Sequence, residues 1–356
     1  MGTLKSVDPE LRKAARLLPP GYALHRGLSA PRAFMNVVGW VGRIRGLKQE
    51  QINANVSVRV HRPTESIDPG PALLWIHGGG TIMGTAAQED KFCRRLANFT
   101  DVTVVAVEHR LAPEYPYPTP IEDCYVALCW LAKQPWVDPG RIAIGGASAG
   151  GGIAAKLAQV AFDRGEIPLA MQMMAYPMLD DRTGEGTNQP RRIVWSARDN
   201  QLAWRWYLGG ADPKLASPAR REDLSGLAPA WLGIGTLDLF YEESVSYATR
   251  LREAGVPVHL QVAEGAFHAF DFIAPKASVS SPSRQYLVSR ATILRQPVPV
   301  IAVRTRGPGL EARCHGWNRS ISRRRRLKAE GPSLPDGRGL PARAESGGRP
   351  CRIRPK

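Results

Sequence analysis

The sequence contains few cysteines, and their spacing matches no metal site. There are five among 356 residues, namely Cys93, Cys124, Cys129, Cys314 and Cys351. An odd number, sparsely used, is typical of reduced thiols rather than of a disulfide framework. We therefore expect a cytoplasmic protein without a structural metal, and we read Cys124 and Cys129 as small core residues.

Long apolar runs are also lacking. No stretch approaches the roughly 20 apolar residues that a membrane-spanning helix needs. Residues 1–18 are charged and lack the apolar centre of a secretory signal peptide. The sequence thus predicts neither a transmembrane segment nor a signal peptide.

Acidic residues are scarce at the C-terminal end of the chain. Of the net charge of +16, +11 falls after residue 297, where fifteen Lys or Arg accompany four Asp or Glu. The segment 297–356 is rich in Arg, Gly and Pro and has no periodic apolar pattern, which predicts a basic, disordered tail. The alternative is an arm that binds nucleic acid or an anionic membrane. We favour the disordered extension, with non-specific binding of polyanions and no specific nucleic-acid partner.

Apolar runs alternate with helical patterns from residue 56 onwards. Strands are predicted at residues 56–60, 72–76, 102–107, 142–144, 170–178, 230–235 and 258–263. Helices are predicted at residues 8–18, 31–45, 87–97, 121–131, 153–158 and 240–254. Buried strands that alternate with helices indicate an α/β fold with a mostly parallel sheet covered on both faces.

Three segments flank or interrupt this pattern. Residues 1–50 read as helices that either flank the domain or cover a site. Residues 180–227 form a long insertion between two strands, of the kind that covers an active site. Residues 281–296 are the best candidate for a final helix, cut short by Pro297 and Pro299. We expect N-terminal cap helices in 1–50, a catalytic domain in 51–296 and the tail in 297–356.

A serine stands at a glycine-rich turn between a predicted strand and a predicted helix. Residues 146–150 read Gly-Ala-Ser-Ala-Gly, and this places Ser148 in the G-x-S-x-G pattern of a nucleophile elbow. Alone the pattern is weak, because a glycine-rich turn with an incidental serine, or a phosphate-binding loop, also fits it. The phosphate alternative lacks the Gly-Lys-Ser/Thr ending of a P-loop.

Other strand ends carry the groups that such a serine needs. Residues 77–80 read His-Gly-Gly-Gly directly after a strand, a motif that supplies oxyanion-hole donors in serine hydrolases. Asp238 follows the strand at 230–235, although an aspartate there also suits a helix N-cap. Of the histidines that follow Ser148, His268 lies at a strand end, His259 lies within a strand, and His315 lies in the tail. The ordered set Ser148, Asp238 and His268 predicts a nucleophile, an acid and a base.

Taken together, these motifs resemble the hormone-sensitive-lipase-like (family IV) carboxylesterases and lipases of the α/β-hydrolase fold. The resemblance covers residues 56–272 and rests on the motifs at 77–80, 108–114, 146–151, 176–177 and 265–268. It implies Ser148 as nucleophile, His268 as base and Asp238 as its partner, with oxyanion donors at Gly78, Gly79 and Ala149. It further implies a cap built from residues 1–50 and 180–227.

Two positions depart from the family pattern. Ala147 stands where many members carry aspartate, and the residues after Asp238 read Leu-Phe-Tyr-Glu-Glu. His268 argues against a likeness to the related plant gibberellin receptors, which lack the catalytic histidine.

The resulting hypothesis is a serine carboxylesterase for short- to medium-chain acyl esters. It needs no cofactor and acts on a small-molecule ester, while a homodimer is left open. An amidase or lactone hydrolase with the same triad remains an alternative. So does a non-catalytic ligand-binding or nucleic-acid-associated protein on a hydrolase scaffold.

Overall fold

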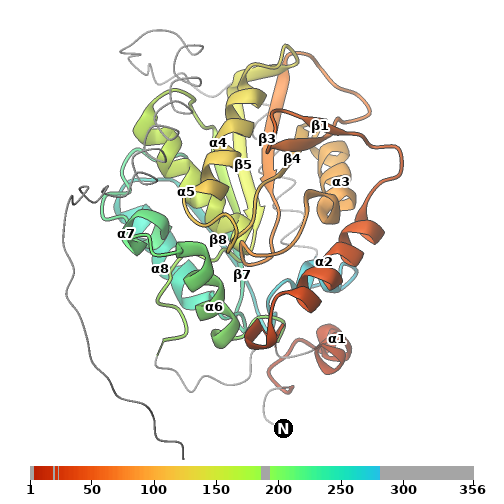
Figure 1. Cartoon of the computed structure of the whole chain (residues 1–356), viewed down its shortest axis with the longest axis vertical. Coiled ribbons are helices and arrows are strands. Elements are labelled where there is room, and N and C mark those ends of the chain that lie inside the picture. Colours follow the sequence, from red (N-terminus) through yellow and green to blue (C-terminus); the bar gives the residue numbers. More distant parts are fainter. Residues whose placement is uncertain (1–3, 19–20, 23, 186–192, 281–356) are drawn as a thin grey trace, which may run out of the picture. The chain divides into compact units, whose positions relative to one another are not determined.

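The computed structural model describes residues 4–18, 21–22, 24–185 and 193–280. Its centre is an eight-stranded sheet in the order β1-β2-β4-β3-β5-β6-β7-β8 (Figure 1). Its first two pairings, β1–β2 and β2–β4, are antiparallel, and all later ones are parallel. The predicted mostly parallel sheet is therefore confirmed. The strands are β1 (Gln49–Gln51), β2 (Ser57–His61), β3 (Gly70–Ile76), β4 (Thr103–Glu108), β5 (Val137–Ala147), β6 (Met171–Ala175), β7 (Ala230–Gly235) and β8 (Val258–Ala263).

Strand boundaries follow the apolar pattern except where polar residues or turns intervene. β7 and β8 have the predicted bounds. β6 ends earlier than predicted because Tyr176 turns out of the strand at φ 36°. β5 begins earlier, at Val137. β1 was not predicted, since its three residues are polar and exposed.

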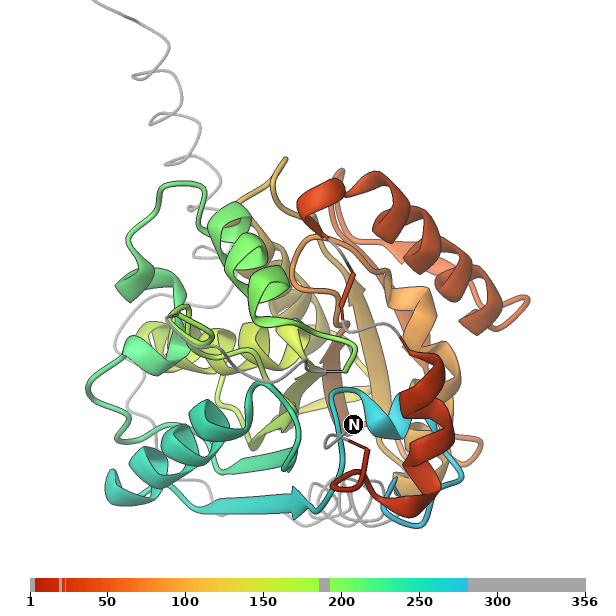
Figure 2. The same ribbon diagram turned by 90° about the horizontal axis from the view of Figure 1, so that it is seen from below.

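Helices cover both faces of the sheet (Figure 2). They are α1 (Arg12–Leu17), α2 (Ser29–Gly42), α3 (Asp90–Thr100), α4 (Thr119–Ala132), α5 (Ala149–Arg164), α6 (Ala197–Leu208), α7 (Pro213–Ala216), α8 (Tyr241–Glu253) and α9 (Phe270–Ile273). Short 3₁₀ turns are η1 (Pro9–Leu11), η2 (Leu24–Arg26), η3 (Ala86–Glu89) and η4 (Pro218–Arg220).

Successive residues of a central strand pack into two different hydrophobic clusters, one on each face of the sheet. Met173 and Trp231 belong to the cluster that includes α3 side chains. Their neighbours Met174 and Leu232 belong to the cluster with α5 and α8. This alternation is the period-two pattern expected of a sheet buried on both faces.

The N-terminal segment is tied to the 180–227 insertion. The carboxylate of Asp199 in α6 accepts hydrogen bonds from the backbone N–H groups of Tyr22 (2.9 Å) and Leu24 (3.0 Å). Two glycines of α2 allow close packing on the η3 region: a Cβ on Gly39 would lie 2.6 Å from Oγ1 of Thr85, and one on Gly42 would lie 2.9 Å from the carbonyl oxygen of Gln88. Both segments therefore lie over the sheet end that carries the glycine-rich motif.

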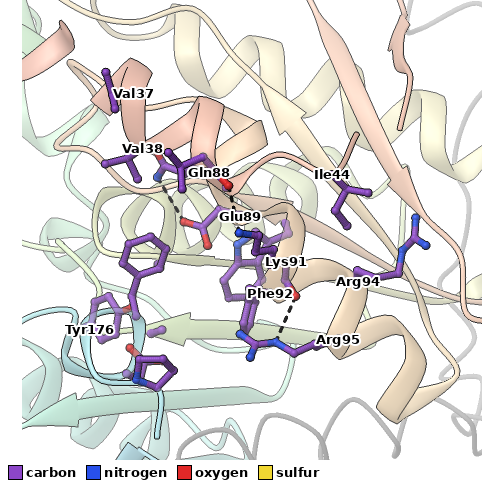
Figure 3. A pocket seen from close by; sticks show the side chains of 18 residues that line it. Val37, Val38, Ile44, Gln88, Glu89, Lys91, Phe92, Arg94, Arg95 and Tyr176 are labelled. Atoms are coloured by element: carbon purple, nitrogen blue, oxygen red, sulfur yellow. Dashed lines mark hydrogen bonds between the residues drawn. The ribbon is translucent and has the colours of Figure 1, made fainter. Parts of the chain in front are cut away.

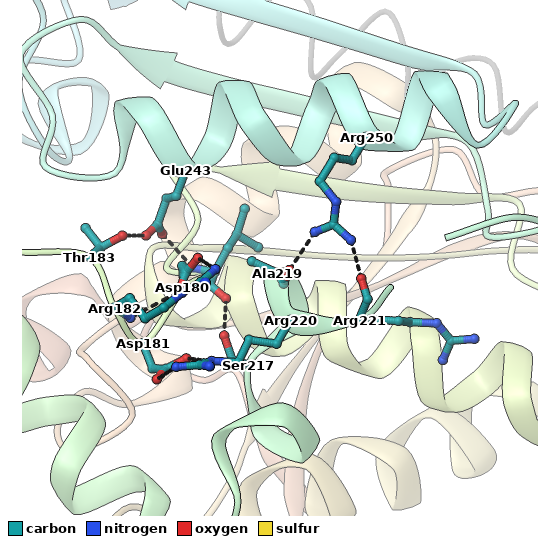
Figure 4. A network of polar contacts seen from close by, with 11 residues as sticks. Asp180, Asp181, Arg182, Thr183, Ser217, Ala219, Arg220, Arg221, Glu243 and Arg250 are labelled. Carbon is teal, nitrogen blue, oxygen red and sulfur yellow. Dashed lines mark hydrogen bonds and ion pairs between the residues drawn. The ribbon is translucent and has the colours of Figure 1, made fainter. Parts of the chain in front are cut away.

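A polar network anchors the insertion on α8 (Figure 4). Glu243 accepts a hydrogen bond from the backbone N–H of Leu179 at 2.6 Å and one from the hydroxyl of Thr183. Arg220 forms a bidentate pair with Asp181, with both distances 2.6 Å. Burial raises the pKa of Glu243 well above its usual range.

Some predicted segments fall outside the described residues. These are the final helix at 281–296, the tail at 297–356, and with them Cys314, Cys351 and His315. In the part of the chain that the structure describes, no helix has the length and apolar character to cross a bilayer.

Candidate active site

Ser148 occupies a strained backbone position between β5 and α5. Its φ and ψ are 56° and −123°, which side-chain-bearing residues seldom adopt. Its N–H donates to the carbonyl of Ala175 at 2.8 Å. A Cβ on Gly146 would lie 2.5 Å from the backbone of Gly150, and one on Gly150 would lie 2.1 Å from the carbonyl oxygen of Ile76. Only glycines at these two positions allow the strand and helix to meet so closely.

Three predicted residues from three strand ends come together in a hydrogen-bonded row. Nε2 of His268 lies 2.9 Å from Oγ of Ser148, and Nδ1 of His268 lies 2.8 Å from Oδ2 of Asp238. Asp238 and His268 are buried, at 1% and 4% exposure. The other oxygen of Asp238 accepts the N–H of Phe240 at 3.0 Å, so the aspartate also holds the turn that leads into α8.

Aromatic rings hold the His268 imidazole from the side. The ring of Tyr176 lies 5.1 Å away at 71°, and that of Phe240 lies 5.3 Å away at 82°. By contrast, the competing His259 lies at the start of β8, in register with Trp231 and half-buried. It is not part of the row.

The glycine-rich segment lies beside Ser148. A Cβ on Gly78 would be 3.4 Å from Cβ of Ser148, and Ala149 begins α5 directly after the serine. Gly79 has φ 125°, a region favourable to glycine. In the described part of the chain, no hydrogen bond occupies the N–H of Gly79 or of Ala149.

Two side chains of η3 hold the peptide of Gly78, and the sequence did not reveal them. Nε2 of Gln88 donates to the carbonyl of Gly78 at 3.4 Å and to Oε1 of Glu89 at 3.3 Å. The backbone of Gly78 also lies near the Glu89 carboxyl and lowers its pKa. Burial and, to a smaller extent, the nearby Asp271 raise the pKa of Glu89 to about 7, although these hydrogen bonds act to lower it. In the sequence, Gln88 and Glu89 look like the polar start of a helix, so no local signal marks them.

Two cavities meet at this point. The smaller, of about 210 Å³, contains Ser148 and His268 and is bounded by Trp195 from the insertion and by Phe34 and Met35 of α2. The larger, of about 780 Å³, lies between α2, α3 and the segment after His268 (Figure 3). Residues that line both are Val38, Gln88, Glu89, Ala147, Tyr176 and Phe272.

The described residues offer no metal site: no group of three or more His, Cys, Asp or Glu side chains lies close enough to hold an ion. Three cysteines of the described chain, Cys93, Cys124 and Cys129, are buried and form no disulfide with one another. Burial raises the pKa of the Cys93 and Cys124 thiols. These thiols are therefore neutral packing groups.

Comparison with known proteins places this geometry in context. Residues 73–272 match the family model of the alpha/beta hydrolase fold. Esterase LipI of Mycobacterium tuberculosis is 32% identical over 290 residues, which cover 74% of this chain and 88% of that protein. Ethyl acetate hydrolase of Pseudomonas putida is 34% identical over 226 residues, 60% of this chain and 70% of that protein. The solved structure of a bacterial heroin esterase superposes with a TM-score of 0.74 and 35% identity, covering 83% of this chain and 99% of that one.

Proposed function

Since the chain belongs to the hormone-sensitive-lipase-like family of the α/β-hydrolase fold and is a carboxylic ester hydrolase, we propose that Ser148, His268 and Asp238 are its catalytic triad. The observation that carries the proposal is the unbroken row from Oγ of Ser148 through His268 to Asp238, at 2.9 and 2.8 Å. A serine hydroxyl is a weak nucleophile at neutral pH and needs a base within hydrogen-bond reach.

In this mechanism, His268 takes the proton of Ser148 as the serine attacks the ester carbonyl. Asp238 holds the imidazole in the tautomer that accepts at Nε2, and it stabilises the imidazolium that forms. His268 then gives the proton to the departing alcohol. Water attacks the acyl-serine in the same way and releases the acid.

Backbone N–H groups would stabilise the tetrahedral oxyanion. We propose Gly78, Gly79 and Ala149 for this role, and each such donor lowers the barrier by on the order of 3 kcal/mol. The open N–H groups of Gly79 and Ala149 support their assignment. The position of Gly78 supports its assignment, because a Cβ there would lie 3.4 Å from Cβ of Ser148.

The smaller cavity suggests the size of the substrate. Its volume of about 210 Å³ and its Trp195 wall suit esters with a short- to medium-chain acyl group. Relatives named ethyl acetate hydrolase and acetyl-hydrolase support the same class. We propose that residues 1–50 and 180–227 form the cap that limits this cavity. A cytoplasmic location and a homodimer remain predictions.

A single substitution tests the nucleophile. The Ser148→Ala variant should lose hydrolysis of p-nitrophenyl butyrate while retaining the circular dichroism spectrum and cooperative unfolding of the parent protein. A folded variant that turns the ester over at close to the parental rate would exclude Ser148 from this role.

A further inference from the structure

Helix α2 presents large apolar side chains to the outside. Phe34, Val37, Trp40 and Val41 are between 57% and 62% exposed. The helix buries only a narrow stripe, formed by Pro31, Met35 and Gly39. An exposed, contiguous apolar surface of this kind marks an interaction site.

Exposed cations border this surface, while Glu89 and Asp271, which line the larger cavity, are buried, and Arg32 is paired with Glu114. The stretch 26–48 contains five Arg or Lys and no Asp or Glu. Arg43, Arg45 and Lys48 are exposed, and none forms an ion pair with another described residue. Lys91, Arg94 and Arg95 of α3 add further cations at the rim of the larger cavity (Figure 3). The complementary partner is a surface that is both apolar and anionic.

The apolar surface is continuous with the cavities that lead to Ser148. Phe34 lines the smaller cavity, whereas Val37 and Val41 line the larger. Phe272, which is 45% exposed, lines both. The apolar surface of α2 therefore borders both cavities.

A second copy of the chain fits this surface poorly. In a twofold dimer the same patch lies on both sides of the interface. Cations would then stand on both sides of the interface, and the stretch 26–48 supplies no carboxylate to pair with Arg43, Arg45 or Lys48 of a second copy. A helix with Trp, Phe and Val on one side and Arg and Lys at its border is instead typical of helices that lie on anionic bilayers.

We propose that α2 docks this protein on the surface of an anionic lipid bilayer. Trp40, Phe34, Val37 and Val41 insert at the level of the headgroups, while the flanking cations contact lipid phosphates. An ester dissolved in the bilayer then reaches the cavities without crossing bulk water. This last consequence rests on the proposed esterase function, whereas the docking itself does not.

Docking is measured first without catalysis. Full-length Ser148→Ala protein is sedimented with vesicles of phosphatidylcholine that contain phosphatidylglycerol, and with vesicles of phosphatidylcholine alone. We expect binding to the anionic vesicles and little to the neutral ones. Adding Trp40→Asp should weaken the partition coefficient about tenfold, because a large apolar side chain no longer leaves water. The matched control is Phe99→Asp, which makes the same charge change at a side chain of α3 that is 71% exposed and lines neither cavity.

The control also separates α2 from the basic segment after residue 297. If Trp40→Asp and Phe99→Asp bind equally well, other cations hold the vesicles and the proposal is wrong. Conversion of a dimer into a monomer by Trp40→Asp, seen by light scattering, would also overturn it, because the face would then join two copies.

The second measurement uses the active enzyme, in which Ser148 is retained. Trp40→Asp should slow hydrolysis of a medium-chain ester held in anionic vesicles about tenfold, in proportion to lost binding. Hydrolysis of dissolved p-nitrophenyl butyrate should stay unchanged, since Trp40 lines neither cavity. If the protein does not bind vesicles but still hydrolyses the soluble ester, the docking proposal is wrong and the esterase proposal is unaffected.

Discussion

The imidazole rings of His77 and His109 stack face to face, with centroids 4.4 Å apart and planes within 5° of parallel. Both rings are buried. Burial lowers the pKa of His77 to about 4, and burial together with the neighbouring His77 lowers the pKa of His109 to about 4. The pair is therefore neutral at pH 7, directly beside the glycine-rich loop.

The lowered pKa values of these buried histidines predict acid sensitivity. Because the pKa of His109 is lower in the folded than in the unfolded chain, the unfolded chain binds more protons between pH 6.5 and 4. The free energy of unfolding then falls as the pH falls through this window. For one such histidine the loss from pH 7 to pH 5 is about 2 kcal/mol. The His109→Gln variant should lack this contribution to the loss of unfolding free energy. Urea unfolding of parent and variant at pH 7 and pH 5 measures it. An equal pH dependence in parent and variant would contradict the prediction.

Glu89 should make the free energy of unfolding depend on pH in the opposite direction. Its pKa is raised to about 7 by burial, so the folded protein holds a proton that the unfolded chain releases near pH 4.5. Its contribution to stability is present below pH 4.5 and is lost as the pH rises through 7. Between pH 5 and pH 8, Glu89→Gln should gain stability relative to the parent by about 2.5 kcal/mol.

The control for Glu89 is Glu243→Gln. Glu243 is equally buried and accepts the backbone N–H of Leu179, in the network of the insertion and α8. Both variants should change the pH dependence of unfolding, whereas only Glu89→Gln should lower kcat, because Glu89 and Gln88 hold the peptide of Gly78. A kcat that changes equally in both variants would remove any special role for Glu89 in the loop.

The histidines of the site can be told apart by substitution. His268→Ala should be nearly as inactive as Ser148→Ala, because no other base lies within reach of the serine oxygen in the described site. His259→Ala, half-buried at the start of β8, should keep kcat/KM within a factor of about two. The reverse pattern would mean that the base has been misassigned.

Two tryptophans of the insertion should affect activity differently. Trp195 bounds the smaller cavity, and its ring lies 2.6 Å from where a Cβ of Gly80 would stand. Trp195→Ala should therefore shift the preferred acyl chain to greater length in a series of p-nitrophenyl esters. Trp204 is buried and lines neither of the two cavities at the site, so Trp204→Ala should lower stability by about 3 to 5 kcal/mol and leave the preferred length unchanged.

Removal of the residues after Gln296 should have little effect on small-ester hydrolysis. All proposed catalytic residues precede position 272, whereas +11 of the net charge follows position 297. The shortened protein should elute from a polyanionic resin at lower salt, because fewer arginines release counterions on binding. Loss of cooperative unfolding would show instead that the removed segment is needed for packing.

Much of the architecture was determined by the sequence alone. Apolar runs such as those of β7 and β8 predicted buried strands, because a strand covered on both faces excludes polar side chains. Ser148, Asp238 and His268 each follow a predicted strand, so the shared carboxyl edge of a parallel sheet predicted that they would meet. β1 was missed, because an exposed edge strand of three polar residues carries no such pattern.

Tertiary structure alone decided what surrounds those residues. Gln88 and Glu89 hold Gly78 because the chain folds η3 back onto the loop. The raised pKa of Glu89 arises from burial, which depends on side chains far away in sequence. The sequence predicted a helix at residues 31–45 but could not tell which of its apolar side chains stay exposed. That depends on Gly39 and Gly42, which pack α2 against the η3 region, so that only one narrow stripe is covered and Trp40 remains in contact with solvent.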